Sequence, residues 1–194
     1  MRGPLRRGMR LVAAALLSAG IALAEIGQGA ALAQTLPASA EADLKAGRAR
    51  LDFLAGDWRV EQFLPTRVDQ WRSSGESALR FNSTLNDLYL ETRAGSGGYV
   101  YDIVFSFDVA RQLYRIISRD DRSGLIDVYE GVFDERGALI VSNVGPGTHY
   151  VSGGIRYHNR MIFTPTAGGW EWLVEVSGNG GQSWQPQVRV VARR

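Results

Sequence analysis

Tyr99-Val100-Tyr101-Asp102-Ile103-Val104-Phe105-Ser106-Phe107-Asp108 is the stretch that decides the fold. Aromatic rings and one isoleucine occupy every odd position, and smaller or polar side chains occupy most of the even positions. A period of two places successive side chains on opposite faces of a strand. The stretch therefore predicts a strand with one ring-rich face.

The same period extends over most of the chain in both directions. Strands are expected at Trp58–Leu64, 75–81, 84–93, 99–108, 112–119, 125–133, 138–144, 155–164, 170–177 and 184–192. Short strands at a spacing of 8–12 residues are typical of a sandwich or a barrel. Glycine-containing turns at 134–137 and 167–169 fit hairpins, since glycine takes the positive φ that such turns need.

These strands predict an all-β fold, an antiparallel up-and-down barrel of about ten strands. Closing the sheet removes the exposed edges that an open sheet would present. A barrel of this size can hold one small ligand in its interior. One short helix is expected ahead of the barrel, over Ser39–Leu54, with Ser39 as N-cap and Gly56 as the stop. Gly47 weakens the middle of this helix, so two short turns are an alternative.

The first 33 residues have the layout of a secretory signal peptide. Four arginines among the first ten residues precede an apolar run over 11–24, which is too short for a permanent membrane helix. Ala31-Leu32-Ala33 has small residues at the positions that signal peptidase requires, and Ala22-Leu23-Ala24 is a second candidate. Arg6-Arg7 leaves twin-arginine export open beside general secretion. We expect cleavage after Ala33, a flexible leader at 34–38, a single domain at 39–194 and a periplasmic or secreted location. An uncleaved N-terminal membrane anchor is the less favoured alternative.

The charge of the chain depends on this segment. Without residues 1–33, Lys and Arg fall from 22 to 18 and Asp and Glu from 20 to 19, so the net charge changes from +2 to −1. A nearly neutral domain lacks the basic surface that nucleic-acid partners need, and it lacks a polybasic membrane patch. The sequence has no cysteine, which excludes disulfides, thiolate metal sites and iron–sulfur clusters.

Two motifs stand out. The first opens the barrel and reads Leu51-Asp52-Phe53-Leu54-Ala55-Gly56-Asp57-Trp58. The second reads Ser177-Gly178-Asn179-Gly180-Gly181-Gln182-Ser183-Trp184 and fits the Asp-box pattern, a hairpin in which Ser177 and Asn179 bind backbone groups, Gly181 takes positive φ and Trp184 packs beneath. The Asp-box pattern specifies a turn and not a reaction.

Together these motifs resemble a bacterial family of lipocalin-like (calycin-type) barrel domains of unknown function, over about residues 45–194. The resemblance implies that Trp58, two residues after Gly56, plugs the closed end of the barrel under an arginine from the last strand. Arg189, Arg193 and Arg194 are the candidates, with Arg189 preferred. The chain is also similar in outline to haem-binding nitrobindin barrels, but these rely on a histidine near the chain's end, and here no histidine follows His158. We therefore expect no cofactor.

Aromatic side chains with polar tips suit an apolar pocket with a few oriented hydrogen bonds. The predicted ligand-pocket residues are Tyr101, Phe105, Tyr129, Tyr157 and Trp172. The expected function is binding of a small apolar or amphipathic molecule, without evident catalysis; a rival interpretation is that the rings only fill the core. The sequence indicates no oligomeric state.

Two further functions stay open. One is a cavity-based enzyme of the isomerase or hydratase type, for which Asp127, Glu91 and Arg115 could point inward by strand parity. The other is a structural or interaction protein of the cell envelope with a filled barrel. His149 and His158 have no carboxylate at ligand spacing, and residues 120–127 lack the calcium-loop pattern, so no metal site is expected.

Overall fold

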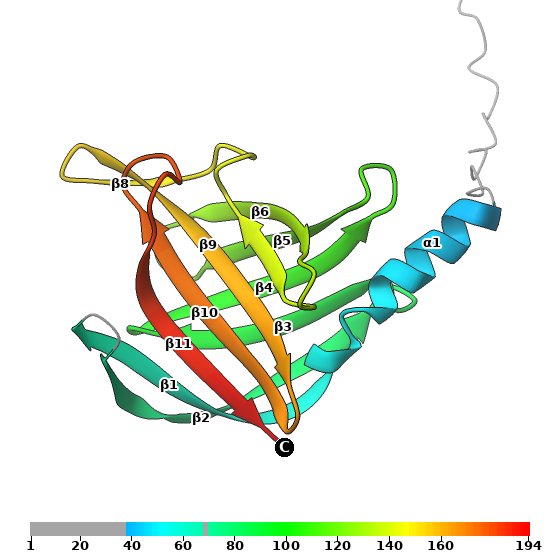
Figure 1. The fold of residues 1–194 in the computed structure, drawn as a ribbon, viewed down its shortest axis with the longest axis horizontal. Coiled ribbons are helices and arrows are strands. Elements are labelled where there is room, and N and C mark those ends of the chain that lie inside the picture. The colour runs from blue at the N-terminus through cyan, green and yellow to red at the C-terminus, as the bar shows by residue number, and fades with distance from the viewer. Residues whose placement is uncertain (1–37, 68–69) are drawn as a thin grey trace, which may run out of the picture. The chain divides into compact units, whose positions relative to one another are not determined.

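The computed structural model describes residues 38–67 and 70–194, so the predicted signal peptide and all of the predicted leader except Ala38 lie outside the described residues. One α-helix and one short 3-10 helix precede eleven strands (Figure 1). The helices are α1 (Ala38–Ala49) and η1 (Asp52–Leu54). The strands are β1 (Gly56–Arg67), β2 (Gln70–Thr84), β3 (Tyr89–Ser96), β4 (Tyr99–Asp108), β5 (Leu113–Asp120), β6 (Ile126–Phe133), β7 (Leu139–Ser142), β8 (Tyr150–Ser152), β9 (Ile155–Thr166), β10 (Gly169–Ser177) and β11 (Gln185–Arg193).

Ten of these strands form a closed antiparallel barrel. Each strand from β1 to β6 pairs with the one that follows it, β7 pairs with β9, and the ring continues through β10 and β11 back to β1. β8 stays outside the ring and pairs only with β9. The predicted fold class is confirmed, because the period of two is preserved along nearly every strand.

The predicted strand limits differ from the observed ones mainly at β1, β2, β3 and β8. The predicted strands 75–81 and 84–93 place a strand across residues 85–88, which form the turn between β2 and β3, where Leu85, Asn86 and Asp87 have positive φ. β1 continues past Pro65 to Arg67, because the hairpin with β2 shifts register there and Pro65 needs no ladder hydrogen bond. β8 was not expected at all, since its three residues follow the Gly/Pro-rich segment 145–148 and are too few to show a period.

The predicted helix over Ser39–Leu54 is divided into α1 and η1. Gly47 lies where α1 approaches β4, and a Cβ at this position would stand 2.2 Å from the ring of Phe107. The glycine therefore allows the close approach of helix and barrel, which is a packing role and not only a weak point. Among the described helices, none combines the length and apolarity needed to cross a bilayer.

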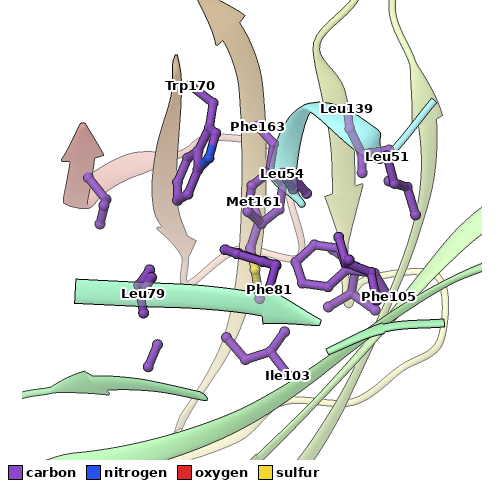
Figure 2. Packing of buried hydrophobic residues seen from close by; sticks show 14 of the residues in the cluster. Leu51, Leu54, Leu79, Phe81, Ile103, Phe105, Leu139, Met161, Phe163 and Trp170 are labelled. Carbon is purple, nitrogen blue, oxygen red and sulfur yellow. The ribbon is translucent and has the colours of Figure 1, made fainter. Parts of the chain in front are cut away.

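The core fills one half of the barrel. We call the end where β1 begins and β11 ends the closed end, and the opposite end, where β4 begins and β5 ends, the open end. Leu51 and Leu54 are fully buried and cover the closed end from the turn and η1 (Figure 2). Edge-to-face ring contacts then link Trp58, Trp170, Phe81, Phe105 and Phe163, with ring centroids 5.3–5.9 Å apart. Such ring pairs add stabilisation to the burial of their area.

Trp58 lies in this closed end, as the resemblance implies. Its indole N–H donates to the Leu54 carbonyl at 2.7 Å, and the ring is 5% exposed. The arginine over it is Arg194, whose Cζ lies 4.8 Å from the ring centroid. The preference for Arg189 was wrong, because this side chain points outward from β11 and pairs with Glu171 at 2.7 Å.

The Asp-box hairpin joins β10 to β11 at the open end. The Ser177 hydroxyl accepts from the Gly181 amide at 2.8 Å, and the Asn179 side-chain carbonyl accepts from the Ser183 amide at 3.0 Å. Gly181 has φ +87°, a conformation that favours glycine. The Trp184 ring lies under the guanidinium of Arg160, at 4.7 Å. These contacts define the conformation of the turn between β10 and β11.

Candidate functional site

A cavity of about 500 Å³ occupies the open half of the barrel. This volume falls in the range of pockets that take small molecules. Its apolar floor and lower wall come from five strands of the ring, through Val60, Leu79, Ile103, Met161 and Val190. The open end carries polar side chains, among them Gln62, Ser96, Asp120, Ser123 and Gln187.

A gradient of side-chain size along the strands produces this cavity. The inward positions of β5 run from Tyr114 and Ile116 near the closed end to Ser118 near the open end. On β3 the gradient runs from Leu90 to Ala94 in the same direction. Large side chains fill the closed half and small ones leave space in the open half, so the backbone ring encloses both a core and a pocket.

A buried polar network forms part of the cavity wall. The Asp127 carboxylate, on a residue that is 5% exposed, accepts from the Tyr129 hydroxyl at 3.2 Å and from the Asn143 amide at 3.3 Å. The Asn143 carbonyl in turn accepts from the Asn159 backbone amide at 2.7 Å. Asp127, Tyr129 and Asn159 line the cavity, and Asn143 supports them from behind. The network holds a carboxylate in fixed orientation inside an otherwise apolar barrel.

The cavity environment changes the acidity of its tyrosines. Burial raises the pKa of Tyr129, and the neighbouring Asp127 carboxylate raises it further. The pKa of Tyr101 is also raised, first by burial and then by the charge of Asp120, with smaller contributions that include Asp121 and Asp127. Both phenols therefore stay protonated and neutral well above neutral pH, where they can donate hydrogen bonds.

Two polar atoms of cavity-lining residues have no hydrogen-bond partner among the described residues. They are the side-chain carbonyl oxygen of Asn159 and the indole N–H of Trp172. A buried polar group without a partner costs about 1–3 kcal/mol. A ligand with a complementary polar group could remove part of this cost.

The charges of the cavity are of one sign. Asp120 and Asp127 line it, and no arginine, lysine or histidine does so in the described part of the chain. Arg122 lies close by, with its Cζ 5.4 Å from the centroid of the Tyr99 ring at the open end. The interior is therefore anionic, with one cation at its mouth.

Three of the five predicted pocket residues line the cavity, namely Tyr101, Tyr129 and Trp172. Phe105 has the expected inward orientation but lies deeper, in the filled core, in contact with the Phe81 and Phe163 rings. Tyr157 lies beyond the rim, where it stacks on Tyr150 in the β8–β9 hairpin at 5.2 Å. Parity gives the face of a strand and not the depth along it, so it could not separate these positions.

Sequence reasoning missed several other members of the wall. Tyr150 was missed because β8 was missed, and Asn159 because an asparagine at an inward position gives no signal by itself. Of the three candidates for an enzyme site, only Asp127 points inward. Glu91 and Arg115 point to the outer face, because the inward positions of β3 and β5 are taken by their neighbours Leu90 and Ile116. On that face Glu91 accepts a hydrogen bond from Thr84, and Arg115 pairs with Glu130.

The two histidines lie outside the cavity lining. Their rings are 5.5 Å apart, with His149 in the loop before β8 and His158 on the outward face of β9. A haem needs an axial side-chain ligand, and the cavity offers it no imidazole, so the described residues do not fit a histidine-ligated haem. No group of three or more potential metal-binding side chains occurs in residues 38–67 and 70–194.

Comparison with known proteins supports the architecture alone. No family model matches the sequence, and no curated protein does. Among solved structures, the chain is similar to Rv2717c from M. tuberculosis, with a TM-score of 0.50 and 15% sequence identity over 76% of this chain and 96% of that one. At this identity the likeness shows the fold.

Proposed function

We propose that this protein is a small-molecule binding barrel whose ligand lies in the open-half cavity, with its apolar body on the floor and a polar group at Asp127. The observation that carries the proposal is the cavity itself, which combines about 500 Å³ of space with a buried, hydrogen-bonded carboxylate. A carboxylate inside a barrel destabilises the fold unless it is compensated, and a bound polar group at Asp127 would supply that compensation. A filled envelope protein would not need this space.

We also propose that the chain is exported and belongs to the lipocalin-like barrels. The layout of residues 1–33 supports export, and the Trp58–Arg194 contact at the closed end supports the family. The mass of the protein recovered from a periplasmic extract tests export, because cleavage after Ala33 leaves residues 34–194. Recovery of the uncleaved chain in the membrane fraction would contradict it.

Native mass spectrometry of the purified protein tests ligand binding. We expect a small molecule that leaves on denaturation, or uptake of one from a mixed library of lipids and metabolites. Ser118→Phe should abolish this uptake, because it places a ring in the cavity from β5. Ile117→Phe is the matched control, since the neighbouring side chain is 38% exposed on the outer face. A bare polypeptide mass with no uptake, or equal uptake by both variants, would contradict the proposal.

The Asp127–Tyr129 hydrogen bond favours a second candidate function. A carboxylate and a neutral phenol in contact inside a cavity could act as base and acid in a proton transfer on the bound molecule. The test is the mass and retention time of the ligand after incubation with the protein. A product that forms with the native protein and not with Tyr129→Phe would establish catalysis, and an unchanged ligand would leave binding alone.

A further inference from the structure

The charged and aromatic side chains that line the cavity indicate the chemical class of its ligand. Resting on the proposed function, we infer that the ligand is an amphipathic organic cation, with an ammonium-type head at Asp127 and the aromatic wall and an apolar body on the cavity floor.

The first argument is the state of Asp127. Its two hydrogen-bond donors, Tyr129 and Asn143, are both neutral, and the carboxylate forms no ion pair with any described residue. A buried charge that is bonded only to neutral groups remains uncompensated. Each carboxylate oxygen also keeps one acceptor position free, since a carboxylate has about four in all. A cationic head would supply both the charge and the missing donors.

The second argument is the aromatic lining. Five aromatic residues of the described chain line the cavity, namely Tyr99, Tyr101, Tyr129, Tyr150 and Trp172. Aromatic faces attract ammonium and guanidinium groups through the ring quadrupole, and several rings around one site are how proteins recognise alkylated ammonium. At the mouth of the cavity, the guanidinium of Arg122 already lies over the Tyr99 ring.

The third argument is the absence of competing chemistry. An anionic ligand would meet Asp120 and Asp127 without a basic partner in the described lining. A bare metal ion would need more acidic or imidazole ligands than the described residues bring together. The side-chain carbonyl of Asn159, which lacks a donor, adds another acceptor for a protonated amine. Charge, rings and free acceptors all favour the organic cation.

Three probes with the same decyl chain test this inference, each below its micellar concentration. They are decylammonium, decanol and decanoate, titrated into the purified protein by calorimetry at neutral pH. We expect decylammonium, which carries both the positive charge and N–H donors, to bind at least tenfold tighter than the other two. The preference should persist at 0.5 M NaCl, because a buried pair is screened less than a surface one.

Two carboxylate variants locate the effect. Asp127→Asn keeps the shape and one acceptor, and it should lose at least tenfold in ammonium affinity with decanol affinity unchanged. Asp102→Asn is the matched control, since this carboxylate lies on the outer face of β4 near Arg93 and Arg119, and it should change neither. If Asp127→Asn does not fold, Trp172→Leu replaces it, with a severalfold loss of ammonium affinity that exceeds the loss for decanol.

The outcomes separate this inference from the proposed function. Equal binding of all three probes, or unchanged ammonium affinity in Asp127→Asn, would contradict the inference of a cationic ligand. Either result would leave the proposed function, binding of a small molecule, intact. Failure of all three probes to bind, together with no uptake from the mixed library, overturns both.

Discussion

The two halves of this barrel share the same strands but differ in what fills them. In the closed half, the inward positions carry Trp58, Phe81 and Trp170, whose rings pack edge to face. In the open half, the same strands carry smaller or polar side chains around a cavity of about 500 Å³. The closed half supplies apolar burial and the open half contains polar groups that lower stability. Such a division is expected when one half holds the fold and the other binds a ligand, because functional sites are where local rules of stability are broken.

Two tryptophans on β10 test this division most strongly. Trp170 and Trp172 point to the same face two residues apart, but Trp170 is fully buried in the core and Trp172 lines the cavity. Trp170→Ala should lower the free energy of unfolding by about 3–5 kcal/mol, because it leaves a void in the packed half. Trp172→Ala should cost less, since the Trp172 ring stacks on Phe163 on one side but borders existing space on the cavity side. Urea denaturation measures both, and equal losses would show that the open half also stabilises the fold.

Disrupting the polar network behind the cavity should give the next largest loss in the free energy of unfolding. Asn143 is fully buried, and Asn143→Ala removes the acceptor of the Asn159 backbone amide and one donor to Asp127. We expect a loss of about 2–3 kcal/mol in the free energy of unfolding, because buried polar groups are left without partners. Asn82→Ala on the exposed face of β2 is the control and should stay within about 0.5 kcal/mol of the native value. A small effect at position 143 would mean that water enters the open half and replaces these bonds.

Alkaline pH should lower the stability of the protein through Tyr129, which lies in the open half. Burial and the Asp127 carboxylate raise the pKa of Tyr129 above its ordinary value, so the folded state keeps a proton that the unfolded chain releases near pH 10. This contribution to stability is complete below that pH and is lost as the pH rises above it, by up to about 1.4 kcal/mol per pH unit. The melting temperature between pH 8 and 11 should therefore fall more steeply for the native protein than for Tyr129→Phe. Parallel curves would place Tyr129 in contact with water.

The sequence predicted the closed half better than the open half, for a physical reason. An alternating strand pattern, as at Tyr99–Asp108, reports which side chains face inward, and the barrel and most strand limits followed from it. Which inward residues meet across the barrel depends on register and depth, and these come from pairings between distant strands. Phe105 and Tyr101 share one face of one strand, yet one lies in the core and the other in the cavity wall.

The polar members of the site were harder still to predict. Strand parity offered Asp127 as an inward residue but offered Glu91 and Arg115 equally, and only the structure separates Asp127 from these two. Asn143 and Asn159 come together through the end of β7 and the middle of β9. One usable signal was available: β5 runs from Tyr114 and Ile116 to Ser118, and a strand whose inward residues shrink along its length marks the open end.

The smallest effect concerns the arginine that covers the closed end. Arg194 lies over the Trp58 ring, whereas Arg189 pairs with Glu171 on the outer face, and loss of either cation should cost at most about 1 kcal/mol. Single variants therefore cannot distinguish them, and double-mutant cycles with Trp58→Leu are needed. We expect about 0.5 kcal/mol of coupling between Arg194→Ala and Trp58→Leu in the free energy of unfolding, and none between Arg189→Ala and Trp58→Leu. Coupling at Arg189 instead would restore the sequence-based preference and would mean that β11 shifts its register in solution.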